Sequence, residues 1–292
     1  MARPRARRHL WALRITLLVF LLWLPAAAPA QPATLPNRPG SLKFAVIGDS
    51  GTGGRHQREV AAVMAAARER FPFELVLMLG DNLYGGEGPE DRRRKFEEPY
   101  AALLEADVPF YAAIGNHDEP LQRFYPLFHM YGQAYYSVAA PRQSVRFFAL
   151  ESGGMDAAQL AWLDRALAVS TEAWRIVFLH EPIYSSGRRH GPAVALGERI
   201  EPILVRHGVD VVFAGHEHFY ERLTPQHGVA YFISGAAAKL RRGNIDRASP
   251  AFAAGFDEDR SFMLIEIDGD TLFFEAISRT GQTVDSGTIL RD

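Results

Sequence analysis

The chain has 292 residues, of which 48% are hydrophobic and 23% charged, and this suits one large α/β domain or two small ones. It contains no cysteine, which excludes disulfide bonds, thiolate-bound zinc and iron–sulfur clusters. Metal ligands must therefore come from His, Asp, Glu, Asn or Tyr side chains. With 32 basic and 34 acidic residues, the formal net charge is −2.

Residues 1–30 have the three parts of a secretory signal peptide. Five arginines form a basic region, the apolar stretch 15–24 follows, and Ala28-Pro29-Ala30 is a small-residue cleavage site. We predict cleavage after Ala30, so that the mature protein is secreted or periplasmic. The alternative is an uncleaved membrane anchor, but the apolar stretch is short for a span of about 20 residues, and we expect no stable anchor.

Removal of residues 1–30 makes the predicted mature chain more acidic. The leader carries five arginines and no acidic residue, so 27 basic and 34 acidic residues remain, for a net charge of about −7. An acidic surface does not favour nucleic acid or anionic membranes as partners. Residues 31–40 are rich in proline and polar residues and are predicted to be a short linker.

From Leu42 onward, strand-like runs alternate with helix-like ones. Most of the strand-like runs are continuously apolar, as expected for strands buried on both faces of a sheet. The predicted strands are 43–47, 75–79, 109–114, 146–150, 175–179, 209–213 and 231–234. Apolar residues at helical spacing predict helices around Val60, Leu163 and Ile200, the second of them capped near Asp156.

The C-terminal part of the chain has a different pattern. Two alternating runs in residues 261–276 flank Asp268-Gly269-Asp270, which predicts a β-hairpin. The fold therefore closes with antiparallel strands, and we interpret residues 41–292 as one domain.

Five short motifs carry polar side chains at the ends of predicted strands. They are Gly48-Asp49-Ser50-Gly51, Gly80-Asp81-Asn82-Leu83-Tyr84, Gly115-Asn116-His117-Asp118, Val177-Phe178-Leu179-His180 and Gly215-His216-Glu217-His218. In an open α/β sheet, ligands bind outside the carboxyl ends of the strands. We therefore expect the motifs to meet at one edge, with the glycines allowing sharp turns and close approach.

Seven side chains of these motifs form the candidate ligand set of one two-metal site. They are Asp49, Asp81, Tyr84, Asn116, His180, His216 and His218. Carboxylate, imidazole and phenol groups suit two neighbouring hard or borderline cations, and such a pair clamps the oxygens of a phosphoryl transfer. A single Gly-Asp pair after a strand is usually a turn or a helix cap, but five such turns in this order are improbable by chance.

The five motifs resemble the pattern of the calcineurin-like metallophosphoesterase superfamily and, more narrowly, that of the purple acid phosphatases. The resemblance runs from about Lys43 to Lys239. It implies an α/β fold, the metallophosphoesterase four-layer α/β/β/α sandwich of two mixed β-sheets flanked by helices. Tyr84 narrows the resemblance, because most members of the superfamily have a residue there that binds no metal. The alternative for Tyr84 is an aromatic side chain packed beside the site.

The resemblance implies two metal ions, Fe(III) and a divalent ion that is Fe, Zn or Mn. The implied Fe(III) ligands are Asp49, Asp81, Tyr84 and His218. The implied ligands of the divalent ion are Asp81, Asn116, His180 and His216, with Asp81 bridging. In this arrangement the dinuclear metal centre activates a hydroxide that attacks phosphorus.

His117 is the motif histidine that the resemblance leaves off the metals. It implies that His117 faces the substrate, stabilises the phosphoryl oxygens and protonates the leaving alkoxide. Asp118 is expected to orient His117, with a helix cap as the alternative. His190, in a basic loop after His180, is a candidate substrate-binding histidine, and the alternative is a solvated loop residue.

The sequence thus predicts an exported metal-dependent phosphoesterase that hydrolyses small-molecule phosphate esters and resembles purple acid phosphatases. An alternative enzyme is a metallophosphodiesterase with an Mn or Zn pair, in which Tyr84 only lies nearby. A less favoured alternative is a non-catalytic metal- or phosphate-binding module, against which the intact His117 and ligand set argue.

Overall fold

Two β-sheets form the centre of the computed structural model, which describes residues 1–2 and 35–291. The six-stranded sheet has the order β13-β12-β11-β1-β2-β3, and the seven-stranded sheet has the order β10-β8-β9-β7-β6-β5-β4. The first contains β1 (Leu42–Ile47), β2 (Leu75–Met78), β3 (Phe110–Ala112), β11 (Ser261–Asp268), β12 (Thr271–Ser278) and β13 (Thr283–Leu290). The second contains β4 (Tyr136–Ala139), β5 (Val145–Ala149), β6 (Trp174–Leu179), β7 (Val211–Ala214), β8 (Tyr220–Leu223), β9 (Ala230–Ser234) and β10 (Phe252–Phe256).

Both sheets are mixed. In the six-stranded sheet β1, β2 and β3 are parallel, whereas β11, β12 and β13 continue antiparallel on the other side of β1. In the seven-stranded sheet β5, β6, β7 and β9 are parallel, and β4, β8 and β10 pair antiparallel. Parallel neighbours end at the same edge of their sheet, so the turns that follow them lie close together.

The two sheets pack face to face through aromatic side chains. Phe44 on β1 contacts Phe147 on β5 and Phe213 on β7, with ring centroids 5.2 and 6.3 Å apart. Phe232 on β9 contacts Phe274 on β12 at 4.9 Å. All five rings are buried, and burial of each contributes about 1.5–3 kcal/mol relative to exposure.

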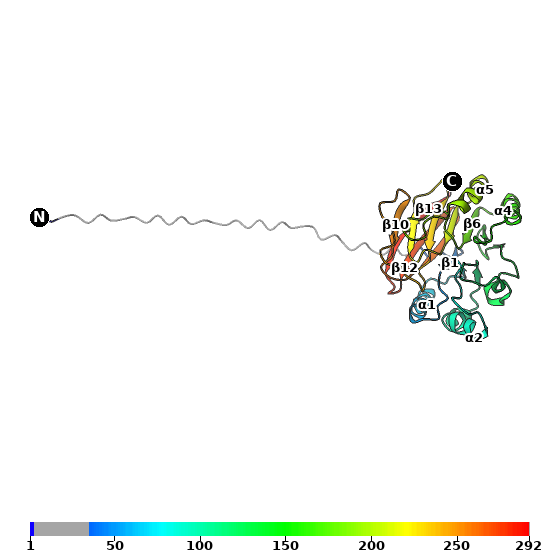
Figure 1. Cartoon of the computed structure of the whole chain (residues 1–292), viewed down its shortest axis with the longest axis horizontal. Helices are drawn as coiled ribbons and strands as arrows, with labels where there is room; N and C mark the ends of the chain where they lie inside the picture. The colour runs from blue at the N-terminus through cyan, green and yellow to red at the C-terminus, as the bar shows by residue number, and fades with distance from the viewer. Residues whose placement is uncertain (3–34, 292) are drawn as a thin grey trace. The chain divides into compact units, whose positions relative to one another are not determined.

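Helices flank both sheets (Figure 1). α1 (Arg55–Arg68) shares a hydrophobic cluster with the six-stranded sheet, whereas α4 (Ala157–Val169) and α5 (Val194–Arg206) share one with the seven-stranded sheet. The shorter helical segments are α2 (Pro89–Arg92), η1 (Arg93–Glu97), α3 (Ala101–Leu104), η2 (Pro120–Phe124) and η3 (Pro126–Phe128). This arrangement confirms the predicted sandwich of two mixed sheets flanked by helices.

Strand β6 explains why so many strand sequences are continuously apolar. Ile176 and Phe178 belong to the hydrophobic cluster between the sheets, and Val177 and Leu179 belong to the cluster shared with α4 and α5. Because successive side chains point to opposite faces, a strand covered on both faces needs apolar residues at every position.

Most predicted elements are confirmed. The seven predicted strands correspond to β1, β2, β3, β5, β6, β7 and β9, and the predicted hairpin corresponds to β11 and β12. Asp156 caps α4, and its Oδ1 accepts the amide of Gln159 at 2.7 Å. Strands β4, β8, β10 and β13 have no counterpart in the prediction, because they contain polar or partly exposed residues and so lack a continuous buried apolar run.

Residues 3–30 of the predicted signal peptide and residues 31–34 of the predicted linker lie outside the described residues. Cleavage after Ala30 therefore stays a prediction. Within residues 35–291, no helix has the length and apolar character that crossing a membrane requires.

Candidate metal centre

Turns after five parallel strands carry the seven candidate ligands. Asp49 follows β1, Asp81 and Tyr84 follow β2, Asn116 follows β3, His180 follows β6, and His216 and His218 follow β7. The first three strands belong to one sheet and the last two to the other. The candidate site therefore lies where the two sheets present the carboxyl ends of their parallel strands.

The turns after β2 and β3 pack backbone against backbone. Gly80 has a φ of +86°, and a Cβ there would lie 2.7 Å from His180 Nδ1 and 2.8 Å from Gly115 Cα. A Cβ on Gly115 would lie 2.2 Å from the amide nitrogen of Asp81. Only glycine leaves room for this contact, so Gly80 and Gly115 allow the ligand-bearing turns to meet.

Three of the candidate ligands have a left-handed backbone conformation. Asp49, Asp81 and His216 have φ angles of 55°, 52° and 66°. This region is uncommon for residues with a side chain, and each instance costs on the order of 1–3 kcal/mol. Such strain concentrates at functional sites, where it directs a side chain that regular structure would point elsewhere.

His180, Asn116 and His216 converge on one point, which we call the imidazole group. His180 Nε2 lies 2.9 Å from Asn116 Oδ1, 3.2 Å from His216 Nδ1 and 3.5 Å from Asp81 Oδ1. The other ring nitrogen of His180 lies 2.9 Å from the carbonyl oxygen of Leu79, to which it donates a hydrogen bond. In the neutral ring Nε2 is then an acceptor that faces other acceptors, and converging lone pairs of this kind suit a cation.

Asp49, Tyr84 and His218 form a second cluster, which we call the phenol group. The Tyr84 hydroxyl lies 3.1 Å from Asp49 Oδ1 and 3.5 Å from His218 Nε2, and the latter two atoms are 3.3 Å apart. Asp49 Oδ2 accepts the backbone amide of His216 at 2.8 Å. This bond fixes the carboxylate so that Oδ1 faces the phenol and the imidazole.

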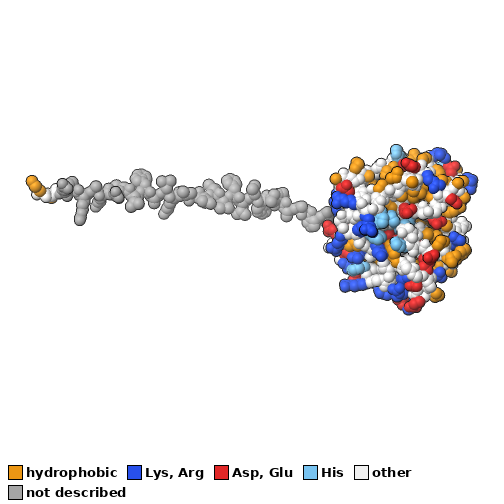
Figure 2. Space-filling model, in the orientation of Figure 1, with side chains coloured by type: hydrophobic (Ala, Val, Ile, Leu, Met, Phe, Trp, Pro, Cys, Tyr) orange, Lys and Arg blue, Asp and Glu red, His pale blue; other side chains and the backbone are white. Residues whose placement is uncertain are grey.

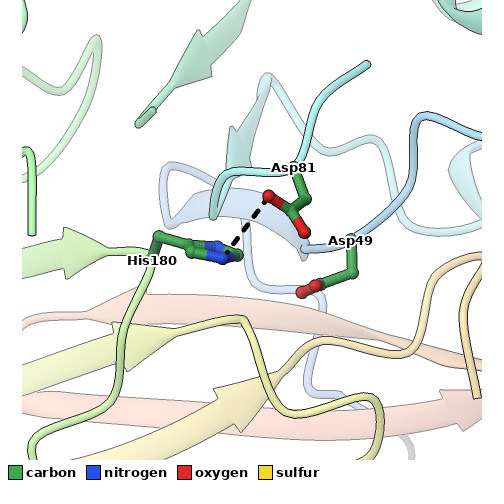
Figure 3. A group of neighbouring side chains, drawn as sticks. All are labelled: Asp49, Asp81 and His180. Carbon is green, nitrogen blue, oxygen red and sulfur yellow. Dashed lines mark ion pairs between the residues drawn. The ribbon is translucent and has the colours of Figure 1, made fainter. Parts of the chain in front are cut away.

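Asp81 lies between the two groups. Its Oδ1 lies 3.5 Å from His180 Nε2, and the nearby Tyr84 hydroxyl helps to lower the pKa of its carboxyl. Figure 3 shows Asp49, Asp81 and His180 pointing toward one another, and their ligand atoms lie within 4.8 Å of one another. All three side chains are buried. Because Asp81 lies between the two groups, its carboxylate has the position that a bridging ligand would need.

Burial opposes ionisation of the acidic side chains of the site, Asp49, Asp81 and Tyr84. Burial raises the pKa of Asp49 well above its ordinary value, and burial followed by the charges of Asp49 and Asp81 raises the pKa of Tyr84. Burial also opposes ionisation of Asp81, but His180 and the Tyr84 hydroxyl outweigh it and lower the pKa of that carboxyl. Buried carboxylates and a phenol beside them are stabilised as anions by a cation, so the donors fit a metal site.

The two histidines after β7 are held in the neutral form. Burial, followed by the neighbouring His180, lowers the pKa of His216 to about 3. Burial, followed by the charge of Arg241, lowers the pKa of His218 to about 4. Both imidazoles therefore offer a lone pair at neutral pH, which is the form that binds metal.

His117 lies beside the site, and its ring contacts none of the candidate ligand atoms of the imidazole group. Its backbone amide donates to Asp81 Oδ1 at 3.0 Å, and its ring centroid lies 5.0 Å from that of Tyr84. The residue is exposed, so its imidazole is accessible to a molecule in the site. The geometry is compatible with the predicted substrate-facing position.

The structure corrects the expectation for Asp118. Its carboxylate does not contact the ring of His117 but accepts the backbone amides of Asn82, Leu83 and Gly115 at 3.0, 3.0 and 2.9 Å. Asp118 therefore ties the turn after β2 to the turn after β3. Burial raises the pKa of this carboxyl to about 7.

His190 lies at the same site, on the loop that follows His180 in the sequence. Its ring centroid is 4.3 Å from that of His216, and the residue is exposed. The buried carboxylate of Glu217 accepts the amide of Gly191 at 2.9 Å, which holds the loop that carries His190. The loop is therefore attached to the turn that bears the His-x-His pair.

Sequence reasoning missed two cations of the site, Lys239 and Arg241. Lys239 Nζ lies 4.1 Å from the centroid of the Tyr84 ring, and the amide of Arg241 donates to the carbonyl oxygen of His218 at 3.0 Å. Figure 2 shows histidine side chains gathered on one face of the molecule with Lys and Arg side chains beside them. The segment that follows β9 has no motif, so only its basic composition hinted at this role.

The comparisons with known proteins agree with this geometry. The sequence profile of the calcineurin-like phosphoesterases matches residues 42–220, which contain all five motifs. The chain belongs to this family. It is accordingly a phosphoric ester hydrolase, and it resembles acid phosphatases of the family in sequence.

Two curated relatives have similar lengths to this chain. Tartrate-resistant acid phosphatase type 5 of Oryctolagus cuniculus is 27% identical over 267 residues, which cover 77% of this chain and 79% of the relative. Purple acid phosphatase 17 of Arabidopsis thaliana is 26% identical over 277 residues, which cover 81% of each chain.

Two solved structures share the fold. The structure described as GAP50, the anchor in the inner membrane complex of Plasmodium, matches with a TM-score of 0.75 and 17% identity, covering 86% of this chain and 89% of that one. Purple acid phosphatase PPD1 from yellow lupin (Lupinus luteus) matches with a TM-score of 0.73 and 18% identity, covering 88% of this chain and 55% of that one. At these identities the likeness concerns the fold alone.

Proposed function

We propose that the protein is an exported phosphoesterase of the purple acid phosphatase type that hydrolyses small phosphate esters with two metal ions. The observation that carries the proposal is the convergence of seven donors, with Asp81 lying between the imidazole group and the phenol group. The names of the curated relatives, tartrate-resistant and purple acid phosphatases, support the same chemistry. The signal-like pattern of residues 1–30 supports export.

Each donor group would hold one metal ion. The ligands assigned to Fe(III) are Asp49, Asp81, Tyr84 and His218. The ligands assigned to the divalent ion are Asp81, Asn116, His180 and His216. Together the ions would supply Lewis acidity toward the phosphoryl oxygens and a lowered pKa for a water molecule.

The two histidines off the metals have different roles in this proposal. His117, exposed beside Tyr84, donates a proton to the leaving oxygen and hydrogen-bonds to the phosphoryl group. His190, beside His216, binds the phosphoryl group as a hydrogen-bond donor. Leu79 keeps the proton of His180 on the nitrogen that faces away from the site.

Tyr84 favours iron over an Mn or Zn pair. Its hydroxyl lies 3.1 Å from Asp49 Oδ1, within the phenol group and not behind it. A phenolate is a hard anionic donor, and a trivalent ion stabilises it more than a divalent ion does.

Metal analysis, a visible spectrum and a 4-nitrophenyl phosphate assay of the purified protein test the proposal together. We expect iron with a second metal, a visible phenolate-to-iron charge-transfer band and phosphatase activity. Tyr84→Phe should remove the band, whereas Tyr135→Phe, which removes the hydroxyl of a tyrosine packed on Trp162, should keep it. If the active protein is colourless and contains manganese or zinc, the assignment of iron is wrong. If the metal-loaded protein has no hydrolase activity, the proposed phosphoesterase function is wrong.

A further inference from the structure

The chain directly after Tyr84 is rich in glycine. Residues 85–88, which we call the glycine segment, have the sequence Gly-Gly-Glu-Gly, and Gly85 has a φ of +76°. Glycine restricts the backbone least of all residues, so this segment needs contacts with the rest of the fold to keep one conformation. The chain before it is already fixed, because the amide of Tyr84 donates to the carbonyl oxygen of Gly51 at 2.9 Å. The position of the phenol therefore also depends on what holds the glycine segment.

A buried lysine holds the glycine segment. Lys95 is 3% exposed, and its Nζ donates to the carbonyl oxygen of Gly86 at 2.6 Å and lies 2.7 Å from Asp91 Oδ1. A buried ammonium group is costly unless it is both paired and hydrogen-bonded, and these two partners meet that need. A Cβ on Gly86 would lie 2.5 Å from Asp91 Oδ2, so the segment packs directly on the ion pair. Asp91 thus fixes the ammonium group, and the ammonium group fixes the carbonyl of Gly86.

Lys95 lies in the π-helical turn η1. The amide of Glu98 donates to the carbonyl oxygen of Arg93 at 2.8 Å, which is a bond across five residues instead of four. The next residue, Phe96, is fully buried and packs against Phe110 with ring centroids 5.0 Å apart. Turns of this kind are rare and occur often at functional sites. The turn therefore directs us to a functional role for its buried lysine.

The same turn is bonded to the loop that carries Asp49. Gln57 on α1 is fully buried, and its Nε2 donates to the carbonyl oxygen of Lys95 at 2.6 Å. Its Oε1 accepts the amide of Gly53, four residues after Asp49, at 2.6 Å. Through Gln57 and the Lys95 side chain, η1 therefore holds the segments that follow two members of the phenol group.

We propose that Lys95 is a positioning residue for Tyr84, which holds the glycine segment in the conformation that places the phenol beside Asp49. This inference rests on the proposed function, in which the Tyr84 phenolate binds iron. Replacing a residue that orients a metal ligand without touching the metal commonly lowers metal affinity by about 10–100-fold. Loss of the ammonium group should therefore weaken iron binding by the phenol group and leave metal binding by the imidazole group intact.

The test measures iron release from Lys95→Met, which keeps the apolar part of the side chain and removes the ammonium group. Metal-loaded proteins are titrated with a chelator while the phenolate-to-iron band is recorded and both metals are counted. We expect the band of Lys95→Met to shift and to disappear at a chelator concentration roughly tenfold lower than in wild type. Arg93→Gln is the matched control, because it removes a cation of the same turn whose partners Glu90 and Glu98 are exposed. It should behave as wild type.

A purely structural role for Lys95 predicts a different result. Lys95→Met would then unfold at a lower denaturant concentration, but its band and its chelator midpoint would equal those of wild type. That result, or an equal loss of both metals, would overturn the positioning role. Lys95→Gln, which has a shorter uncharged side chain, is the second variant if Lys95→Met does not fold, and the same outcomes decide.

The wild type separates this inference from the proposed function. If it hydrolyses no phosphate ester, the proposed function is wrong, and if it shows no iron band, the assignment of iron is wrong. Amide hydrogen exchange of the metal-free proteins then decides the role of Lys95. Exchange in residues 82–88 should be faster in Lys95→Met than in wild type and in Arg93→Gln, and equal exchange in all three proteins would refute the positioning role.

Discussion

Asn116 and His117 are neighbours in the chain, but the turn after β3 gives them different tasks. The amide oxygen of Asn116 lies 2.9 Å from His180 Nε2 and 3.0 Å from His216 Nδ1, inside the imidazole group. His117 contributes its backbone amide to Asp81 at 3.0 Å and turns its ring toward Tyr84. One residue can therefore bind metal while the next one faces the substrate.

This division predicts the behaviour of two variants. His117→Asn should keep both metals and lower kcat for alkyl phosphate esters by ~10²–10⁴-fold, the usual contribution of general acid catalysis. Nitrophenyl esters should lose much less, because a nitrophenolate leaves without protonation. Metal content and kcat for both ester types are the measurements.

His216→Ala is the comparison for that experiment, because His216 belongs to the imidazole group. This variant should lower the metal content of the protein, and its loss of activity should be similar for alkyl and nitrophenyl esters. Equal metal loss in the two variants, or equal loss of activity on all esters by His117→Asn, would contradict the acid role of His117.

A buried carboxyl group lies on the strand that follows the His-x-His turn. Strand β8 follows the His-x-His turn and carries Glu221, which is fully buried. Its Oε2 accepts the amide of Ser186 at 3.0 Å, while Oε1 has no partner in the described structure. Burial raises the pKa of Glu221 to about 7. Strand β8 therefore carries a carboxyl group that binds its proton more tightly in the folded protein than in the unfolded chain.

The raised pKa predicts how stability depends on pH. The folded protein holds the Glu221 proton up to about pH 7, whereas the unfolded chain releases it near 4.5, so stability falls as pH rises through this window. Glu221→Gln should be more stable than wild type above pH 7, by about 3 kcal/mol, with no difference below about pH 4.5. Denaturant unfolding at several pH values measures this, and parallel stability curves for the two proteins would disprove it.

Packing between the sheets predicts a second stability effect. Phe44 contacts aromatic rings on β5 and β7 and is fully buried. Phe44→Ala removes the ring contacts with Phe147 and Phe213 and leaves a cavity between the sheets, so it should lower the free energy of unfolding by about 3–5 kcal/mol. Leu290→Ala, at a largely exposed position on β13, should change it little, and a similar loss in both variants would contradict this picture.

On the scale of the whole molecule, the two sheets supply different parts of one site. The six-stranded sheet provides Asp49, Asp81, Tyr84 and Asn116, and the seven-stranded sheet provides His180, His216 and His218. Neither sheet alone completes the imidazole group or the phenol group. Packing of the aromatic core is therefore a condition for assembling the donors.

The N-terminal prediction also belongs to the whole molecule. If residues 1–30 are a cleaved signal peptide, exported protein should begin at Gln31. N-terminal sequencing of exported material checks this. A sequence that starts at Met1 or Ala2 would favour an uncleaved anchor instead.

The amino-acid sequence by itself determined nine of the thirteen strands in the described residues and the seven candidate donors, whereas the sandwich of two mixed sheets was expected from the family resemblance of the motifs. These are local signals, because a buried strand is continuously apolar and a glycine-flanked turn marks the polar residue after it. The chemical types of the donors are also written in the sequence, so metal binding follows without knowledge of distances.

Only the tertiary structure decided how residues from unrelated segments meet. Lys239 lies over the ring of Tyr84. The carboxylate of Asp118 accepts backbone amides and does not orient His117. Glu217 holds the loop that carries His190 through the amide of Gly191. These contacts join residues far apart in sequence or depend on the conformation of a turn. They follow from how the two sheets pack and where their loops meet, and no short-range pattern of apolar and polar residues encodes that geometry.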